Sequence, residues 1–353
     1  MNILEDLAGM REIDRGGMRA HIESFPNHLV RALEIGRGTE LGLSGEGVTA
    51  IAVLGMGGSA IAGDLVAGLL ADELRVPMRS VRGYELPGFV DPATLVFVSS
   101  YSGNTEETLA AYDAADATGA RIACLTSGGE VARLAGERGH DVIRMPPGFP
   151  PRAALAFSFV PMLVSLWRLG LAGDPREEIE DAVSVCRDTV ARCGLERPVD
   201  RNPAKEIAAW LAGKVPVVYG ATPRASAIAT RWAGQLSENA KTIAHANELP
   251  EMNHNEIVGW GGEEPLSGRG AVIFLRDAED PERVSRRADL TRDEIRASGA
   301  PVRDVESRGE TRLARMLSLV GLGDFVSLYL AFLKCVDPTP VEPIDRLKSA
   351  LSN

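Results

Sequence analysis

The 353-residue sequence predicts an α/β protein with two parallel sheets, each carrying helices on both faces. Three observations lead to this prediction. Short apolar runs alternate with helical patterns along much of the chain, as in repeated strand–helix units. The alternation pauses at two proline-containing stretches, 145–151 and 198–203, and then restarts. Turns rich in glycine or hydroxyl residues follow several apolar runs, at the points where strands of a parallel sheet would end.

The first half begins with helical segments and continues as strands alternating with helices. Residues 1–45 carry an amphipathic helical pattern that is interrupted by glycines from Gly36 onward. Apolar runs rich in β-branched residues favour strands, and the stretches between them favour helices. Strands are expected at 48–54, 79–82, 95–98, 121–125 and 141–144. Helices are expected at 60–74, 109–115 and 130–138.

The second half repeats this order after a helical stretch that runs from Ala153 to about Cys193. Strands are expected at 215–219, 242–245, 271–275 and 301–305. Helices are expected at 227–239, 281–298, 323–336 and 344–351. The repeated order indicates an internal duplication of one α/β unit. We therefore divide the chain into an N-terminal helix plus first domain (1–152), a helical connection (153–200), and a second domain with C-terminal helices (201–353).

Composition and charge narrow the class of protein. The net charge of −11 argues against non-specific binding to nucleic acid and to an anionic membrane surface. No apolar run is expected to span a membrane, and the N-terminal residues do not follow the pattern of a secretory signal. The four cysteines, Cys124, Cys186, Cys193 and Cys335, form no C-x-x-C pair, so a reduced cytoplasmic location is expected. Cys186 and Cys193 are interpreted as packing residues on one helix face.

The segment 98–108 is the strongest indication of a ligand. It lies between a predicted strand and a predicted helix, contains Gly103, and has no basic residue. Its hydroxyl residues are Ser99, Ser100, Ser102, Thr105 and Thr108. Hydroxyls, backbone N–H groups and the dipole of a helix N-terminus together suit a phosphate monoester on a small molecule. A plain helix cap needs one such residue, so this density favours an anion site over a cap.

A glycine-rich turn, Leu54–Ser59, follows another predicted strand. Glycines at this point let the backbone approach a ligand closely. The G-x-G-x-x-G pattern is met only loosely, by Gly55, Gly57 and Ala60, so a dinucleotide fingerprint and a simple tight turn both remain alternatives. If the neighbouring strand carries the hydroxyl-rich turn, both turns meet at the carboxyl edge of the sheet, where such sheets bind ligands.

Two further residues could transfer protons. Glu238 lies near the end of a predicted helix, where an exposed glutamate would be ordinary and a buried one could act as a general base. His254 lies in the polar segment 251–256, which favours proton transfer over a core position. The acidic residues around it match no compact zinc or iron signature, so no metal is expected.

Two cations complete the candidates. Arg152 follows the first proline cluster, and is either a surface charge or a ligand contact at the domain junction. Lys348 lies in the last predicted helix and, taken alone, is a surface lysine.

Considered together, these segments resemble the bifunctional phosphoglucose/phosphomannose isomerases, which belong to the phosphoglucose isomerase superfamily and contain two sugar-isomerase (SIS) domains. The resemblance runs in order along nearly the whole chain. It is carried by Gly-Met-Gly-Gly-Ser-Ala at 55–60, Ser-Tyr-Ser-Gly-Asn-Thr-Glu-Glu-Thr at 100–108, Ser-Glu-Asn at 237–239, His-Asn-Glu at 254–256 and Asp-Pro-Thr-Pro-Val at 337–341. The hydroxyl-rich turn alone indicates an SIS domain, and the other segments narrow the resemblance to the isomerase branch of these proteins.

The resemblance implies a fold of two flavodoxin-like SIS domains and a set of substrate contacts. Ser59, Ser100, Ser102 and Thr105 would hold the 6-phosphate of a sugar. Gly57 and Gly58 would pass close to the sugar itself.

It also implies catalytic roles. Glu238 would move a proton between C1 and C2 through a cis-enediol intermediate, whose negative charge Arg152 would stabilise. His254 and Lys348 would assist ring opening, with His254 reaching the site from a neighbouring subunit of a homodimer. The chemistry of aldose–ketose isomerisation needs a carboxylate and a cation and requires no metal or redox cofactor.

The implied reaction interconverts fructose 6-phosphate with glucose 6-phosphate and mannose 6-phosphate, within carbohydrate metabolism such as glycolysis and gluconeogenesis. Thr339 is a candidate for the residue that tolerates both epimers at C2. A non-catalytic protein that binds sugar phosphates through SIS domains is the alternative. A ketose-phosphate aminotransferase would need a glutaminase domain with an N-terminal cysteine, and residue 2 is asparagine.

Overall fold

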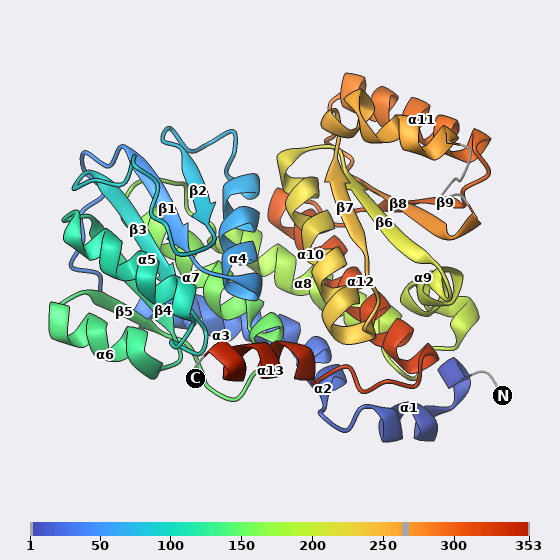
Figure 1. The fold of residues 1–353 in the computed structure, drawn as a ribbon, viewed down its shortest axis with the longest axis horizontal. Coiled ribbons are helices and arrows are strands. Elements are labelled where there is room, and N and C mark those ends of the chain that lie inside the picture. The colour runs from blue at the N-terminus through green and yellow to red at the C-terminus, as the bar shows by residue number, and fades with distance from the viewer. Residues whose placement is uncertain (1–2, 263–267, 352–353) are drawn as a thin grey trace.

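The computed structural model describes residues 3–262 and 268–351, which form two α/β halves side by side (Figure 1). The first half contains a five-stranded sheet in the order β2-β1-β3-β4-β5. Its strands are β1 (Ala50–Leu54), β2 (Met78–Val81), β3 (Thr94–Ser99), β4 (Arg121–Thr126) and β5 (Asp141–Arg144). All of its strand pairs are parallel, as predicted.

The second half contains a four-stranded parallel sheet in the order β7-β6-β8-β9. Its strands are β6 (Val215–Gly220), β7 (His245–Glu248), β8 (Gly270–Arg276) and β9 (Val302–Glu306). When the strands of each sheet are numbered from its own first strand, this order is 2-1-3-4, which is the order of the first four strands of the first sheet. The order 2-1-3-4-5 is that of flavodoxin-like sheets, and the predicted fold class is therefore confirmed.

Helices cover both faces of each sheet. In the first half, α5 (Glu106–Ala117) and α6 (Gly129–Arg138) pack on one face around Tyr112 and Val131. The other face packs against α3 (Phe25–Gly38), α4 (Gly57–Leu69) and α7 (Leu155–Arg168). These apolar faces cover strands such as β3, which is buried along its whole length.

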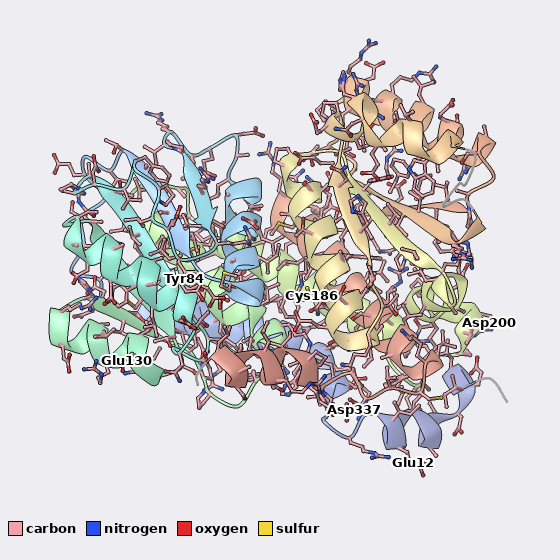
Figure 2. All side chains as sticks on the ribbon, in the orientation of Figure 1. Glu12, Tyr84, Glu130, Cys186, Asp200 and Asp337 are labelled. Carbon is pink, nitrogen blue, oxygen red and sulfur yellow. The ribbon has the colours of Figure 1, made fainter. Side chains whose placement is uncertain are left out.

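The second half has the same layered build. Helix α11 (Glu282–Ala297) packs on one face through Ala288 and Ile295. The opposite face is covered by α9 (Pro203–Leu211), α10 (Pro223–Ala240) and α12 (Arg312–Leu333). Helix α8 (Arg176–Cys193) packs beside α12, and Cys186 and Cys193 are buried there, as expected for packing residues. Figure 2 labels Cys186.

The remaining helices lie at the chain ends. The amphipathic N-terminal region forms α1 (Leu7–Ile13), α2 (Met18–Glu23) and α3, and α13 (Glu342–Leu351) ends the described chain. The sheets occupy residues 50–144 and 215–306, and the domain limits at 152 and 200 stay predictions. Between the sheets, α4 contacts α10, so the two halves meet along these helices (Figure 1).

Two predicted elements were placed wrongly. The strand expected at 242–245 begins only at His245, because Lys241 and Thr242 end α10 instead. Lys241 adopts a left-handed conformation (φ 50°), and the Thr242 N–H donates to the Leu236 carbonyl. The helix expected from Gly323 begins at Arg312, capped by Thr311, and its glycines lie in the helix interior.

The expectation that no apolar run could span a membrane was also too strict. Helix α12 is long and apolar enough to do so by length and composition alone. Its apolar stretch is 83% buried within the fold, which identifies it as the core helix of the second half.

Candidate active site

Two turns meet at the carboxyl edge of the first sheet, because β1 and β3 are neighbours there. The glycine-rich turn follows β1 and the hydroxyl-rich turn follows β3. The two are in contact: the backbone N–H of Tyr101 donates to the Ser59 hydroxyl at 3.4 Å. This is the switch point of the sheet, where strand order reverses and α/β proteins bind ligands.

The hydroxyl-rich turn is held in shape by its own side chains. The hydroxyls of Ser100 and Thr105 lie 3.1 Å apart, and the N–H of Gly103 donates to Ser100 at 3.1 Å. Gly103 has φ 71°, and a Cβ there would lie 1.9 Å from the Gly128 carbonyl, so only glycine fits. Ser102 is exposed at the outer side of the turn and accepts a bond from the Asn104 N–H. The structure thus gathers the four predicted phosphate-binding hydroxyls around two touching turns.

Arg152 lies at the junction of the two halves and is only 3% exposed. Its Nε donates to the Asn239 side chain at 2.6 Å, and one terminal nitrogen donates to the carbonyls of Pro338 and Thr339. Its other terminal nitrogen lies 3.5 Å from the Glu238 carboxylate. Burial lowers the pKa of the Arg152 guanidinium, and the charge of Glu238 acts in the opposite direction. These contacts fix one guanidinium edge and leave the other facing Glu238.

Glu238 is placed by the last turn of α10. That helix begins at Pro223 with Thr222 as its N-cap, and it ends at the left-handed Lys241. The Glu238 side chain is 31% exposed and reaches the edge of a cavity of about 170 Å³ between the two halves.

Four of the predicted site residues line this cavity, namely Gly57, Gly58, Arg152 and Glu238. The cavity is lined by Gly57, Gly58, Ile61, Arg82, Arg152, Thr230, Arg231, Gly234, Gln235 and Glu238. Gly58 allows the close approach of α4 to the Arg152 segment, because a Cβ there would lie 3.1 Å from the Pro151 carbonyl. The structure therefore brings Arg152 and Glu238 together with the glycine turn of the other half.

Two of the four predicted catalytic residues lie away from this cavity, and its lining also does not include the predicted phosphate-binding residues Ser59, Ser100, Ser102 and Thr105. His254 ends a short 3-10 helix, η4 (Glu251–His254), and is exposed. It adjoins a groove of about 580 Å³ between η5 (Glu256–Gly261) and α11, which includes Asn253 in its lining. Lys348 is on α13, where it is exposed and does not line the cavity.

The segment that carries His254 is anchored by Glu256. The Glu256 carboxylate accepts hydrogen bonds from the Tyr219 hydroxyl, the Asn247 amide and His245, the last at 2.9 Å. Burial would raise the pKa of Glu256, but the bonds from these three side chains together lower it. The network fastens the segment to β6 and β7 while His254 itself stays exposed.

Sequence reasoning missed a buried network behind the cavity. Arg231 pairs with Asp324 of α12 at 2.8 Å, and Gln235 donates to the same carboxylate. Arg231 also donates to the backbone carbonyl of Arg152 at 3.3 Å, so the network supports the segment that carries Arg152. Burial raises the pKa of Asp324, and Arg231 opposes this rise. The detectable signal was Asp324, the one charged residue in the stretch 316–333, since a buried charge needs a partner.

Arg82 was also missed, and a lone arginine after a short strand gives no signal by itself. Across residues 3–262 and 268–351, no cluster of three or more His, Cys, Asp or Glu side chains is placed to hold a metal ion.

The fold and the first switch point define a class, the proteins built from two SIS domains. A family model described as the C-terminal SIS domain of bacterial phospho-glucose isomerase matches residues 200–351. The crystal structure of a hypothetical protein from Thermus thermophilus has the same fold, with a TM-score of 0.76. It is 17% identical and aligns over 99% of this chain and 94% of that one.

Two curated relatives identify the family. A bifunctional phosphoglucose/phosphomannose isomerase of Caldicellulosiruptor bescii is 43% identical over 94% of this chain and 98% of its own. A bifunctional phosphoglucose/phosphomannose isomerase of Aquifex aeolicus is 39% identical over 85% of this chain and 90% of its own. The chain belongs to the family of bifunctional phosphoglucose/phosphomannose isomerases and is an enzyme. This membership favours catalysis over the non-catalytic alternative.

Proposed function

We propose that this enzyme interconverts fructose 6-phosphate with glucose 6-phosphate and mannose 6-phosphate. The observation that carries the proposal is the pair formed by Arg152 and Glu238. A buried arginine and a carboxylate, 3.5 Å apart, line one cavity together with the glycine-rich turn, which contacts the hydroxyl-rich turn. The substrates named for the curated relatives agree with this arrangement.

The first switch point suits the substrate phosphate. Ser59, Ser100, Ser102 and Thr105 supply hydroxyls, and α5 begins next to them at Glu106. Hydroxyls, N–H groups and the helix dipole stabilise a phosphate without a lysine or arginine in the turn. With the phosphate held there, the sugar extends past Gly57 and Gly58 toward the cavity.

Glu238 acts as the base in this proposal. It takes a proton from C2 of the aldose or C1 of the ketose and returns it to the other carbon. The departing proton leaves a cis-enediolate, whose negative charge is stabilised by the Arg152 guanidinium. Because both carbons lie on one short segment of the substrate, a single carboxylate on a fixed helix end can serve both.

Ring opening needs a second proton carrier, and we assign it to His254 and Lys348. His254 lies outside the cavity of its own chain, so a homodimer in which the partner subunit's His254 enters the site accounts for its position.

Two surfaces of the chain are suited to such a dimer. The charged residues that line the groove beside His254 are Arg283, Arg286, Arg287 and one acid, Glu294. The charged residues that line a second cavity, of about 640 Å³, are Glu238, Asp337, Glu342 and one base, Lys241. In a two-fold dimer, the groove of each chain can meet the second cavity of the other chain, so the same contact forms twice. The net positive charge of the groove and the net negative charge of the second cavity favour this contact.

We propose that the protein is located in the cytoplasm, and its free cysteines support this location. Cys124, Cys186 and Cys193 are buried and free, and Cys335 is exposed and free. Free cysteines suit a reducing compartment.

A coupled assay tests the reaction. The purified protein is treated with EDTA and given fructose 6-phosphate, and glucose 6-phosphate and mannose 6-phosphate are measured separately. We expect both products. Glucose 6-phosphate alone would remove the dual specificity, and neither product would remove the proposed reaction.

A further inference from the structure

Arg82 has a position that the proposed mechanism does not use. It follows β2 directly, at the same carboxyl edge as the two turns, and it lines the cavity that Glu238 lines. The Gly55 N–H donates to the Val81 carbonyl at 3.2 Å, which places the start of the glycine-rich turn beside Arg82. The first half thus contributes a cation to a cavity whose base comes from the second half.

The three arginines that line this cavity differ in how firmly they are held. Arg152 is buried and held by Asn239, two carbonyls and Glu238. Arg231 is buried and bonds both oxygens of Asp324. The Arg82 side chain is 41% exposed, and among the described residues its one ion pair is with Asp64 of α4, itself 27% exposed. A solvated ion pair of this kind contributes little to stability, so Arg82 can change partner at low cost.

A sugar phosphate gives Arg82 a better partner. The phosphate is a dianion, and the hydroxyl-rich turn contains no cation to balance it. Guanidinium groups form directed, charge-assisted hydrogen bonds with phosphate and hydroxyl oxygens. These bonds strengthen in a cavity from which a bound ligand has displaced water.

We propose that Arg82 is a substrate-binding residue whose guanidinium exchanges the Asp64 carboxylate for oxygen atoms of the bound sugar phosphate. This inference rests on the proposed function, since it takes a sugar phosphate as the ligand of the cavity. Asp64 holds the arginine at the cavity mouth while the site is empty and competes with the substrate for it.

The first test is Arg82→Ala, assayed with fructose 6-phosphate. We expect KM to rise about tenfold, as for one lost charge-assisted bond, and kcat to stay within about threefold. Arg82→Lys keeps the positive charge but loses the planar set of guanidinium donors, and it should give an intermediate KM. Arg79→Ala is the matched control, because Arg79 is exposed on the same strand and does not line the cavity. Thermal unfolding of each variant verifies the fold.

The second test removes the competing carboxylate. Asp64→Asn should lower KM by about threefold, since Arg82 then has no partner to give up. The double variant should behave like Arg82→Ala alone. An unchanged KM in Arg82→Ala would overturn the proposal. So would an equal rise of KM in both single variants, because it would make the ion pair a structural unit.

The wild-type assay separates the two levels of inference. If the wild-type protein does not convert fructose 6-phosphate, the proposed function fails. If it does and Arg82→Ala keeps the wild-type KM, only the role of Arg82 fails.

Discussion

Arg152 depends on three separate parts of the chain for its position. Its own segment follows the proline cluster, Asn239 belongs to α10, and the carbonyls of Pro338 and Thr339 come from the stretch before α13. Figure 2 labels Asp337 in that stretch, where its carboxylate accepts bonds from the N–H groups of Gly16 and Thr339. A guanidinium fixed at this many points has little freedom left, which suits a group that must meet charge as it develops.

Glu238→Gln tests the base at the residue scale. Glutamine keeps the shape of the side chain and its oxygen toward Arg152 but cannot accept the C–H proton. We expect kcat to fall by about 10²–10⁴-fold, while sugar phosphate still binds. Steady-state kinetics and calorimetric binding of glucose 6-phosphate measure the two effects. Glu12→Gln is the control, because Glu12 is exposed on α1 (Figure 2) and does not line the cavity. Turnover close to wild type in Glu238→Gln would contradict the assignment.

The sequence could predict the residues that belong to local patterns. Gly57, Gly58 and Glu238 were selected from motifs and Arg152 from its place after the proline cluster, and all four line one cavity. Asn239 was part of a quoted motif, but its bond to Arg152 spans 87 positions and could not be anticipated. Arg231 and Arg82 act through contacts in space, and nothing in their immediate neighbours indicates those contacts. Their discovery required the fold.

At the scale of elements, the contact between α10 and α12 is set by a glycine. A Cβ on Gly323 would lie 2.3 Å from the Trp232 indole nitrogen, and Trp232 is buried. The same indole N–H donates to the Leu319 carbonyl at 2.9 Å, so the ring cannot move away freely. Interior glycines in a helix are unfavourable by propensity, and here packing overrides that cost.

This explains why the start of α12 was predicted too late. The predicted helix began at Gly323, and no local pattern indicated the indole that fills the space beside this glycine. The strand β7 was misplaced for a related reason. The predicted strand began at Thr242 and Ile243, which are β-branched and typical of strands, but the backbone groups of Lys241 and Thr242 end α10.

Gly323→Ala should therefore destabilise the protein, although alanine favours helices. We expect a loss of about 1–3 kcal/mol in the free energy of unfolding, as for overpacking in a core. Gly321→Ala is the matched control on the same helix, because its Cβ would meet only the Thr189 methyl at 3.4 Å. It should be neutral or stabilising by up to about 1 kcal/mol. Urea unfolding of both variants measures the difference, and equal effects would contradict this account.

Helix α3 and the proline segment meet at a buried histidine. The His28 ring lies 5.0 Å from the Phe149 ring and 5.2 Å from the Phe157 ring. Burial lowers the pKa of His28 from 6.5 to about 4, with smaller contributions from His21 and Arg31. The native state thus keeps His28 neutral at pH values where the unfolded chain protonates it.

Stability should accordingly fall as the pH drops from 6.5 toward 4, because the unfolded state binds the additional proton. At pH 5.5, this single histidine lowers the free energy of unfolding by about 1 kcal/mol relative to neutral pH. His28→Leu should lose that part of the pH dependence. Urea unfolding of both proteins at pH 7.5 and 5.5 measures it, and parallel losses in the two proteins would contradict the prediction.

The whole molecule uses its two similar halves differently. In the first half, the turns after β1 and β3 present hydroxyls and glycines at the switch point. In the second half, the residue after β8 is Asp277, which is buried against Arg315 at 3.2 Å and accepts a bond from Ser307. Arg224, next to the turn after β6, approaches the same carboxylate at 3.6 Å. In the second half, the switch point is thus filled by ion pairs, whereas in the first half the glycine-rich turn lines the cavity that contains Arg152 and Glu238.

The proposed dimer adds one further requirement, that each site combines Glu238 of one chain with the histidine of the other. Glu238→Gln and His254→Ala should each be nearly inactive alone. When the two variants are unfolded together and refolded, half of the dimers are mixed, and each mixed dimer has one site without a substitution. We expect about a quarter of wild-type activity to return, as two-fold symmetry dictates for shared sites. If His254 acted within its own chain, every site in the mixture would carry a substitution and no activity would return. Mixing Glu238→Gln with Arg152→Ala is the control, since both residues line the cavity of one chain and no rescue should follow.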